Sequence, residues 1–338
     1  MDNKPIKKPW VSFGTSTYKR PVFLKKSLES MLRQTYQDFE IVVSDNDPEG
    51  SAEAVVKELN DPRVRYFNNG SNLGYVKSFN KSIERSEGEF IIMFSDDDPV
   101  YPDMLETFHQ LYIDHPEHAM FLSGCDWFCT DPEMARLYKL NIGTNSCLSN
   151  EHEVNYTHAY SPAEFLQIFF SLKLFSHYLW SACMISRDIL IRSGGLPSYG
   201  TPFLSDYAYL GILSSHSGCV VINKALCCQT LHLQNFGRSQ NDQIPIAVKN
   251  FPVYMEAHMA HLKEWPVIKE QMQRFAALWA VSHLAFLYRY VKGVSLLDTE
   301  KEIFKIDLMK KYRFKYFLKS RVPFVHDLLV KLKKAIKN

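Results

Sequence analysis

The sequence lacks long uninterrupted apolar runs and a strong excess of charge of either sign. Its 39 Lys and Arg residues are balanced by 37 Asp and Glu residues, and this near-neutrality argues against a dedicated nucleic-acid binder. The longest apolar stretches, Phe165–Ile185 and Phe275–Tyr288, are interrupted or too short, because a bilayer-spanning helix needs roughly 20 apolar residues. The first ten residues carry no apolar segment. We therefore expect neither a transmembrane helix nor a signal peptide.

The chain also lacks a paired cysteine pattern. Its seven cysteines are an odd number without the spacing of a zinc site, which predicts reduced thiols in a cytoplasmic protein. Hydrophobic residues make up 46% of the 338 residues and charged residues 22%, which excludes disordered, collagen-like and coiled-coil classes. The length allows one large domain with an appendage, or two domains.

Strand and helix signals alternate over residues 10–125. The predicted strands are Trp10–Thr15, Phe39–Ser44, Val64–Phe67 and Phe90–Phe94. Helical patterns of about 10–15 residues separate them, which predicts an α/β fold with a mostly parallel sheet flanked by helices. Because ligands of such sheets bind at the carboxyl ends of the strands, the residues that follow each strand are the functional candidates.

The rest of the chain is less regular. Residues 130–160 are polar and predict a long loop or an insertion. Ser161 and Glu164 form a capping-box pattern that opens an apolar helix, and the chain is predominantly helical after about residue 240. We therefore expect a catalytic domain over residues 1–239 and a helical C-terminal region over residues 240–338.

Acidic residues follow three predicted strands or loops. Asp45 follows the second strand, the run Asp96-Asp97-Asp98 follows the fourth, and Asp206 follows a loop rich in glycine and proline. Three consecutive carboxylates repel one another unless a cation binds, and Mg²⁺ or a similar hard ion prefers oxygen ligands and substrate phosphates. Each acidic position also has a purely structural alternative. The run Asp96-Asp97-Asp98 could be an acidic turn before the next helix, Asp45 could form an Asx turn, and Asp206 could be an N-cap.

Five segments in this order resemble the family 2 glycosyltransferases, which are inverting enzymes with a GT-A nucleotide-sugar-binding fold. The matching segments are Ser12–Pro21, Glu40–Pro48, Asn72–Asn80, Gly88–Asp103 and Gly194–Asp206. The resemblance covers about two thirds of the chain and implies a GT-A (Rossmann-like) sheet with a C-terminal helical extension.

The resemblance implies a role for individual residues. Thr15, Tyr18 and Arg20 would line the nucleotide pocket, and Asp45 would accept a hydrogen bond from the base, usually uracil. Asn72 would shape the loop beside the nucleotide. Lys77 could approach the diphosphate, although a solvated helix lysine is the simpler role.

The same resemblance implies a metal site and a catalytic base. Asp97 would bind the ion directly, Asp96 would contact ribose or metal, and Asp98 could be a further ligand. His232 would reach the metal and Arg238 the diphosphate. Asp206 aligns with the catalytic base, although Ser205 replaces the usual preceding Glu.

The implied activity is a metal-dependent transfer of a hexosyl or N-acetylhexosaminyl group with inversion, using Mn²⁺ or Mg²⁺. The donor would be a nucleotide-diphosphate sugar, with UDP as the expected carrier, and the acceptor a hydroxyl of a glycan or lipid-linked glycan of the cell envelope. Two alternatives remain at this point: a nucleotidyltransferase that makes nucleotide sugars, and a catalytically degenerate sugar-binding protein.

The C-terminal segment 310–338 is strongly basic. It holds ten Lys or Arg residues and one acid, Asp327, so the remainder of the chain carries a net charge of −7. From Pro323 onward, apolar residues and lysines fall on opposite helical faces, as in helices that bind anionic membrane surfaces. We expect peripheral association with the inner face of the cell membrane; packing on the catalytic domain or on a second copy is the alternative.

Overall fold

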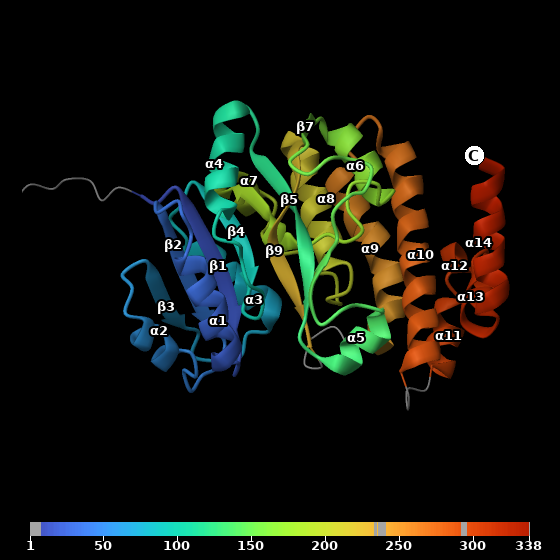
Figure 1. Ribbon diagram of the computed structural model, residues 1–338, viewed down its shortest axis with the longest axis horizontal. Helices are drawn as coiled ribbons and strands as arrows, with labels where there is room; N and C mark the ends of the chain where they lie inside the picture. The colour runs from blue at the N-terminus through green and yellow to red at the C-terminus, as the bar shows by residue number, and fades with distance from the viewer. Residues whose placement is uncertain (1–7, 233–234, 236–240, 292–295, 338) are drawn as a thin grey trace, which may run out of the picture. The chain divides into compact units, whose positions relative to one another are not determined.

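The computed structural model describes residues 8–232, 235, 241–291 and 296–337, with side chains up to residue 330 (Figure 1). The chain divides into two compact units. One comprises residues 1–198 and 205–233, and the other residues 199–204 and 234–338. The boundary after residue 239 that the sequence suggests stays a prediction.

The first unit is built on a nine-stranded mixed sheet. Its strands are β1 (Val11–Thr17), β2 (Phe39–Asp45), β3 (Val64–Asn68), β4 (Phe90–Ser95), β5 (Met120–Cys129), β6 (Gly143–Ser146), β7 (Thr157–Tyr160), β8 (Cys183–Ser186) and β9 (Cys219–Leu231). Their order is β3-β2-β1-β4-β8-β5-β9-β7, and β6 pairs with β5. The β3-β2-β1-β4 half and the β5-β9 pair are parallel, whereas the β8, β6 and β7 pairings are antiparallel.

Helices follow most strands of this unit, as the sequence predicts for residues 10–125. They are α1 (Pro21–Leu32), α2 (Glu53–Leu59), α3 (Tyr75–Arg85), α4 (Met104–Asp114), α5 (Pro132–Tyr138), α6 (Pro162–Phe170), α7 (Arg187–Arg192) and α8 (Ser205–Ser217). Every residue of β2 is buried, so helices or loops cover both faces of the sheet there. The predicted α/β class and the first four strands are confirmed.

The prediction of an irregular segment over residues 130–160 is wrong. This stretch contains α5, β6 and β7. Asp131 caps α5 by accepting hydrogen bonds from two backbone N–H groups, and Pro132 occupies the first turn. Both strands are short and partly exposed, so their sequences lack the apolar alternation of a half-buried strand. The capping box of Ser161 and Glu164 is confirmed.

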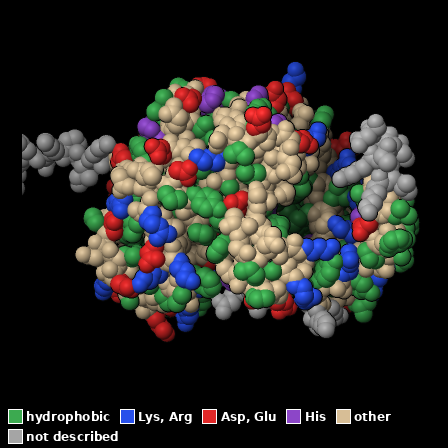
Figure 2. Space-filling model, viewed as in Figure 1, with side chains coloured by type: hydrophobic (Ala, Val, Ile, Leu, Met, Phe, Trp, Pro, Cys, Tyr) green, Lys and Arg blue, Asp and Glu red, His purple; other side chains and the backbone are tan. Residues whose placement is uncertain are grey.

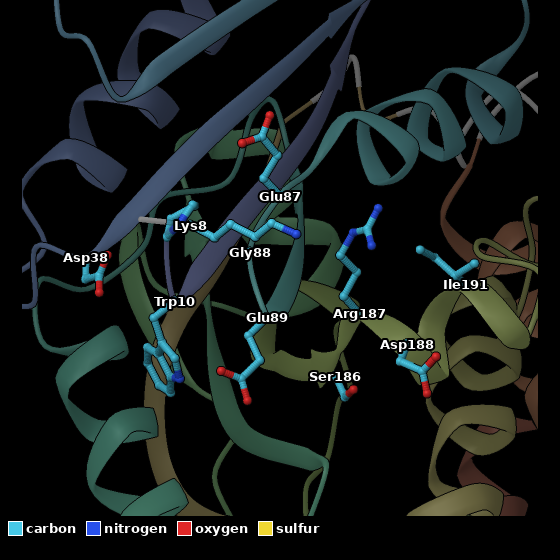
Figure 3. A pocket seen from close by; sticks show the side chains of 11 residues that line it. Lys8, Trp10, Asp38, Glu87, Gly88, Glu89, Ser186, Arg187, Asp188 and Ile191 are labelled. Atoms are coloured by element: carbon cyan, nitrogen blue, oxygen red, sulfur yellow. The ribbon is translucent and has the colours of Figure 1, made fainter. Parts of the chain in front are cut away.

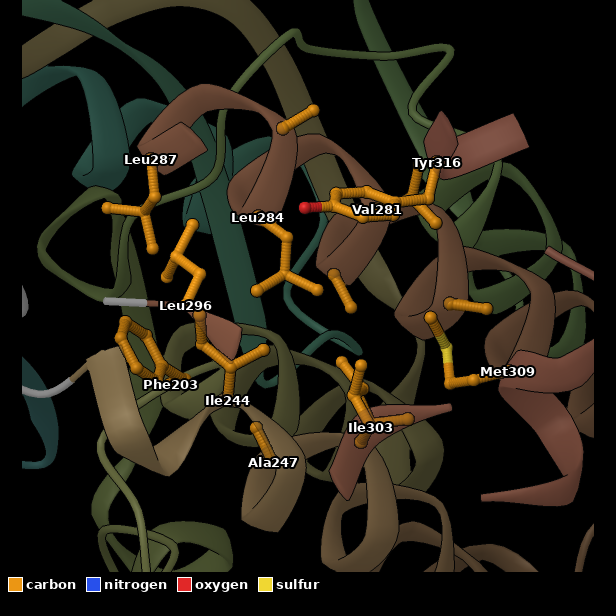
Figure 4. Packing of buried hydrophobic residues seen from close by; sticks show 14 residues of the cluster. Phe203, Ile244, Ala247, Val281, Leu284, Leu287, Leu296, Ile303, Met309 and Tyr316 are labelled. Carbon is orange, nitrogen blue, oxygen red and sulfur yellow. The ribbon is translucent and has the colours of Figure 1, made fainter. Parts of the chain in front are cut away.

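The second unit is helical. Its helices are α9 (Ile244–Met259), α10 (Trp265–Tyr290), α11 (Leu297–Ile303), α12 (Asp307–Lys310), α13 (Arg313–Arg321) and α14 (Pro323–Lys337). Figure 4 shows its core, in which Ile244 of α9, Leu284 of α10 and Ile303 of α11 pack with Tyr316 of α13. Within the described ranges, no helix combines the length and apolar character needed to cross a bilayer.

Candidate functional site

The register of the parallel strands places the functional candidates at one edge of the sheet. Thr17 of β1 pairs with Asp45 of β2, and Ser16 pairs with Ser95 of β4. Asp96, the first residue after β4, therefore lies beside Thr17, whose hydroxyl donates to Asp96 Oδ2 at 2.7 Å. The carboxyl ends of β1, β2 and β4 thus meet where the sequence predicts a site.

Arg20 bridges two carboxylates of the acidic run. Its Nη1 donates to Asp96 Oδ1 at 2.8 Å, and its Nη2 donates to Asp97 Oδ2 at 2.6 Å. The guanidinium also lies over the ring of Phe23, 4.8 Å from its centroid. Arg20 precedes α1, so the turn from β1 into α1 brings the cation to the end of β4. The mutual repulsion of the acidic run is offset by this side chain.

His232 joins the same cluster from the end of β9. Its Nε2 lies 3.1 Å from Asp97 Oδ2 and 3.2 Å from Arg20 Nη2. The imidazole stacks on Phe23 with 4.6 Å between the ring centroids. Residues separated by more than 200 positions are therefore brought into one polar cluster of Arg20, Asp96, Asp97 and His232, which we call the acidic cluster.

The two carboxylates of the acidic cluster ionise differently. Burial, together with the neighbouring charge of Asp97, raises the pKa of Asp96 to about 7. Burial also opposes ionisation of Asp97, but its interactions with His232 and Arg20 outweigh burial and hold the pKa of Asp97 below its usual value. Asp97 is therefore the anion of the cluster, and a bound cation would be needed to ionise Asp96 fully near neutral pH.

Asp98 points toward β9. Its Oδ1 accepts the backbone N–H of Thr230 at 2.8 Å, and the hydroxyl of Thr230 donates to the carbonyl of Asp97 at 2.6 Å. Burial and the charges of Asp97 and Asp96 raise the pKa of Asp98 well above its usual value. In this structure, Asp98 ties the acidic turn to β9; its role as a metal ligand stays a prediction.

Asp206 lies in the first turn of α8 and is held by Trp180. The backbone N–H of Trp180 donates to Asp206 Oδ1 at 2.9 Å, while its indole N–H donates to Ser95 Oγ at 3.2 Å. Burial raises the pKa of Asp206 to about 6, against the opposing effect of the Trp180 hydrogen bond. The pKa of the Tyr75 hydroxyl rises to about 12 through burial and the nearby charge of Asp206. Trp180 thus links the predicted base to the end of β4.

Asp45 is fully buried and accepts three hydrogen bonds. Its Oδ1 accepts the N–H of Asp47, and its Oδ2 accepts the N–H of Ala52 and the hydroxyl of Tyr66, all within 3.0 Å. Burial and the bond to Asp45 raise the pKa of Tyr66 to about 12. The Asx turn that the sequence allows at Asp45 is present, and contact with a base stays a prediction.

The other residues expected near the nucleotide differ in exposure. Thr15 is buried within β1, whereas Tyr18 and Lys77 are exposed. Asn72 Oδ1 accepts from the Asn46 side chain at 2.7 Å and from the Gly74 N–H at 2.9 Å, so it orders the loop before α3. Arg238 lies outside the described residues.

The acidic cluster offers ligand atoms for a divalent ion, but Arg20 occupies part of the space between them. Asp97 Oδ2 and His232 Nε2 are separated by 3.1 Å, which suits two neighbouring ligands that each lie about 2.1 Å from one ion. The carboxylate oxygens suit Mg²⁺ and Mn²⁺, whereas the imidazole of His232 is a less typical ligand of Mg²⁺. Arg20, however, lies between the two carboxylates, so it must move for one ion to contact both.

A second group could hold a metal by geometry alone. Among the described residues, only His115, Glu117 and His118 bring three ligand atoms within 4.8 Å of one another. They lie in the turn after α4, and neither the sequence motifs nor the acidic cluster involves them. The acidic cluster with Arg20 in place is therefore not a closed set of metal ligands.

Three residues that form contacts in the site were not predicted from the sequence. Thr17 follows Thr15 by two positions and so shares its side of β1, a signal that could have identified it. Thr230 and Trp180 gave no comparable signal, because their roles depend on the approach of β9 and on the link between β4 and α8.

A pocket of about 730 Å³ lies at the opposite edge of the sheet (Figure 3). Trp10 precedes β1, Glu89 precedes β4, and Arg187 follows β8, so this pocket is at the amino ends of β1 and β4. None of the described residues with a predicted function lines it. Because α/β sheets bind ligands at the carboxyl ends of their strands, this pocket is not assigned to the donor.

Comparison with known proteins gives a family match and a partial relative. The family described as glycosyl transferase family 2 matches residues 12–193. A GalNAc(5)-diNAcBac-PP-undecaprenol beta-1,3-glucosyltransferase of Campylobacter jejuni is 32% identical over 105 residues, which are 30% of this chain and 34% of that protein. The match therefore spans about a third of that relative's length.

Two solved structures share the fold at low sequence identity. Residues 1–349 of S. aureus TarS, in complex with UDP-GlcNAc, align with a TM-score of 0.59 at 13% identity, covering 93% of this chain and 82% of that one. The mannosyltransferase PcManGT of Pyrobaculum calidifontis, in complex with GDP-Man and Mn²⁺, aligns with a TM-score of 0.53 at 15% identity. This alignment covers 96% of this chain and 89% of that one. These likenesses confirm the expected fold.

Proposed function

The chain belongs to glycosyl transferase family 2, and we propose that it is a metal-dependent inverting glycosyltransferase. In this proposal it moves a sugar from a nucleotide-diphosphate sugar to a hydroxyl of a glycan or lipid-linked glycan. The observation that carries the proposal is the acidic cluster at the end of β4, whose strand is joined through Trp180 to the carboxylate of Asp206.

The acidic cluster is the proposed diphosphate end of the site. Asp97 and His232, with Asp96, would hold the divalent ion, which when bound would neutralise charge on the departing diphosphate. Arg20, displaced from the two carboxylates, retains its charge and is positioned at the same edge to bind a phosphate oxygen. Thr17 keeps Asp96 oriented through its 2.7 Å hydrogen bond.

Asp206 is the proposed general base. As the acceptor oxygen bonds to the anomeric carbon, the bond from that carbon to the diphosphate oxygen breaks, and the hydroxyl proton passes to a carboxylate oxygen of Asp206. Its pKa of about 6 suits this role, because the carboxylate is ionised at neutral pH yet more basic than an ordinary Asp. The hydrogen bonds from the backbone N–H groups of Trp180 and of Asp206 itself hold the carboxylate in place.

The donor and ion are proposed from similarity. UDP is the expected nucleotide, as in the TarS complex with UDP-GlcNAc, and Mn²⁺ or Mg²⁺ is the expected ion, as Mn²⁺ is in the PcManGT complex. The Campylobacter relative is named for a lipid-linked glycan acceptor, which supports an acceptor of that class here. We also propose that the reaction takes place at the inner face of the cell membrane, supported by the basic segment 310–338.

A donor panel tests the proposal. The full chain is incubated with UDP-, GDP- and other nucleotide sugars, with Mn²⁺ or with a chelator, and release of the nucleoside diphosphate is measured. We expect release from one donor that depends on the ion. Pyrophosphate production from a nucleoside triphosphate would instead identify a nucleotidyltransferase, and no turnover with any donor would favour a sugar-binding protein.

A further inference from the structure

A second, basic pocket lies in the helical unit, between α11 and α13. Its volume is about 510 Å³. Four cations line it. Lys301 lies in α11, Lys305 follows that helix, and Arg313 and Arg321 lie at the two ends of α13. Glu300 is its one acidic lining residue. A cavity with this charge favours an anion.

The cations of this pocket are available to an anion. Lys301 and Lys305 make only exposed pairs, with Asp298 at 3.4 Å and Glu302 at 2.5 Å, and such pairs contribute little. Among the side chains that the structure describes, Arg313 is exposed and has no ion pair or hydrogen bond. An incoming anion would therefore displace little when it binds these three residues.

The remaining cation and the acid are fixed in place. Arg321 stacks over the ring of Tyr288, 3.5 Å from its centroid, and lies 3.6 Å from Glu300. Glu300 also accepts the hydroxyl of Tyr316, whose ring is buried in the core of the helical unit (Figure 4). The floor of the pocket is thus a rigid part of the unit, and α13 is held against α10.

Exposed apolar side chains lie on α13, which lines the pocket, and on the next helix, α14. Phe317 lines it and is half exposed, and Phe314 on the same helix is 69% exposed. On α14, Phe324 is 79% exposed, and Leu328 and Leu329 are exposed as well. Figure 2 shows green apolar side chains over α13 and α14, with the nearest blue basic side chains on the side of α10. Large exposed apolar residues beside several cations are the composition of a surface that binds anionic lipid.

We propose that this pocket binds the phosphate of an anionic phospholipid headgroup while the aromatic side chains of α13 and α14 enter the bilayer interface. The inference extends the membrane association included in the proposed function and rests on it in that respect. A membrane is the expected partner because a soluble anion would leave Phe314, Phe324 and Leu328 in water, whereas a lipid surface covers them and supplies the phosphate.

Vesicle co-sedimentation of the full chain tests this proposal. Vesicles of phosphatidylcholine alone are compared with vesicles that also contain phosphatidylglycerol. The double variant Lys301→Gln/Arg313→Gln removes two pocket cations. Its matched control, Lys249→Gln/Lys263→Gln, removes the same charge from two exposed lysines of the helical unit that do not line the pocket. A third variant, Phe324→Ser, tests apolar insertion outside the pocket.

We expect the wild-type chain to bind only the vesicles with phosphatidylglycerol. The pocket variant should lose roughly 25-fold in affinity, since each cation near an anionic surface contributes about fivefold. The control pair should lose much less affinity, and Phe324→Ser should weaken binding to the vesicles with phosphatidylglycerol. Equal loss in the pocket and control pairs, or no binding to anionic vesicles, would overturn the proposal; a concentration-dependent dimer without vesicle binding would assign the surface to a second copy.

The same variants separate this proposal from the proposed function. With a water-soluble acceptor and no vesicles, the pocket variant should release nucleotide at the wild-type rate, because its substitutions lie outside the acidic cluster. Failure of turnover in the wild-type chain would contradict the proposed function without affecting vesicle binding. Reduced turnover in the pocket variant alone would contradict a purely lipid-binding role for the pocket.

Discussion

The backbone N–H of Trp180 donates to Oδ1 of Asp206 at 2.9 Å, and this bond holds the carboxylate in place from outside α8. Because the same residue reaches Ser95 through its indole N–H, the proposed base is tied to the strand that carries the acidic cluster. The proposed base and the acidic cluster are therefore connected through the end of β4, where Ser95 precedes Asp96.

Replacing Asp206 by Asn should reduce transfer to a small residual rate. The Asn side-chain oxygen can still accept from Trp180, so the local structure should persist, while the general-base contribution of about 10²–10⁴-fold is lost. Nucleotide release and donor binding, measured on the same preparation, check this. A variant that keeps wild-type turnover would contradict the assignment, and one that loses donor binding as well would indicate a structural role.

The pH dependence of kcat/KM should report Asp206. Its pKa is raised to about 6, and the base acts only when deprotonated. We therefore expect a rate that is level above this pH and falls about tenfold per pH unit below it, measured at saturating ion. The residual activity of Asp206→Asn serves as the control and should show no such break. An unchanged rate down to about pH 4 would exclude Asp206 as the base.

The link between Trp180 and Ser95 should be measurable as a coupling. Trp180→Phe keeps the backbone donor to Asp206 and removes the indole N–H together with part of the ring, and Ser95→Ala removes its acceptor. Loss of the hydrogen bond should lower the free energy of unfolding by about 0.5–1.5 kcal/mol in each variant, with a further packing cost in Trp180→Phe. The double variant should then cost little more than Trp180→Phe alone. Denaturant unfolding of all four proteins completes the cycle. Fully additive effects would show that the two residues act independently.

Arg20→Gln should increase the stabilisation that Mn²⁺ gives. Without the guanidinium, Asp96 and Asp97 lose their internal cation, which should destabilise the ion-free protein by about 1–3 kcal/mol. Because the ion then replaces a missing charge instead of competing with one, the rise in Tm on adding Mn²⁺ should exceed that of the wild type. Arg63→Gln, which removes a cation paired with Asp61 outside the site, is the matched control. A smaller rise in Arg20→Gln than in the wild type would contradict competition at this position.

The sequence identified the sheet edge but not the contacts across it. Strand-ending acids such as Asp45 and Asp96 were predictable, because parallel strands place their carboxyl ends together and carboxylates at that edge are conspicuous. The pairing of Arg20 with Asp96 and Asp97 was not, because the resemblance placed Arg20 near the nucleotide, whereas the turn after β1 directs it to the end of β4.

The second half of the sheet was harder to predict. β5 is a ten-residue strand that also carries Ser123, Gly124 and Asp126, so its sequence shows neither a purely apolar run nor regular alternation. Its parallel pairing with β9 contains register shifts near Gly124, which no local pattern encodes. His232 and Thr230 reach the acidic cluster only because β9 pairs with β5, so their positions follow from long-range pairing.

Calorimetric titration of the nucleotide-sugar donor identified in the panel, with and without Mn²⁺, tests the central claim that the acidic cluster binds the diphosphate through a cation. It is performed on the wild-type chain and on Asp97→Ala, with Asp206→Asn as the control that keeps the cluster intact. We predict that Mn²⁺ strengthens donor binding to the wild type and to Asp206→Asn but not to Asp97→Ala. Donor affinity that is independent of Mn²⁺ in the wild type, or equally ion-dependent in Asp97→Ala, would contradict the account.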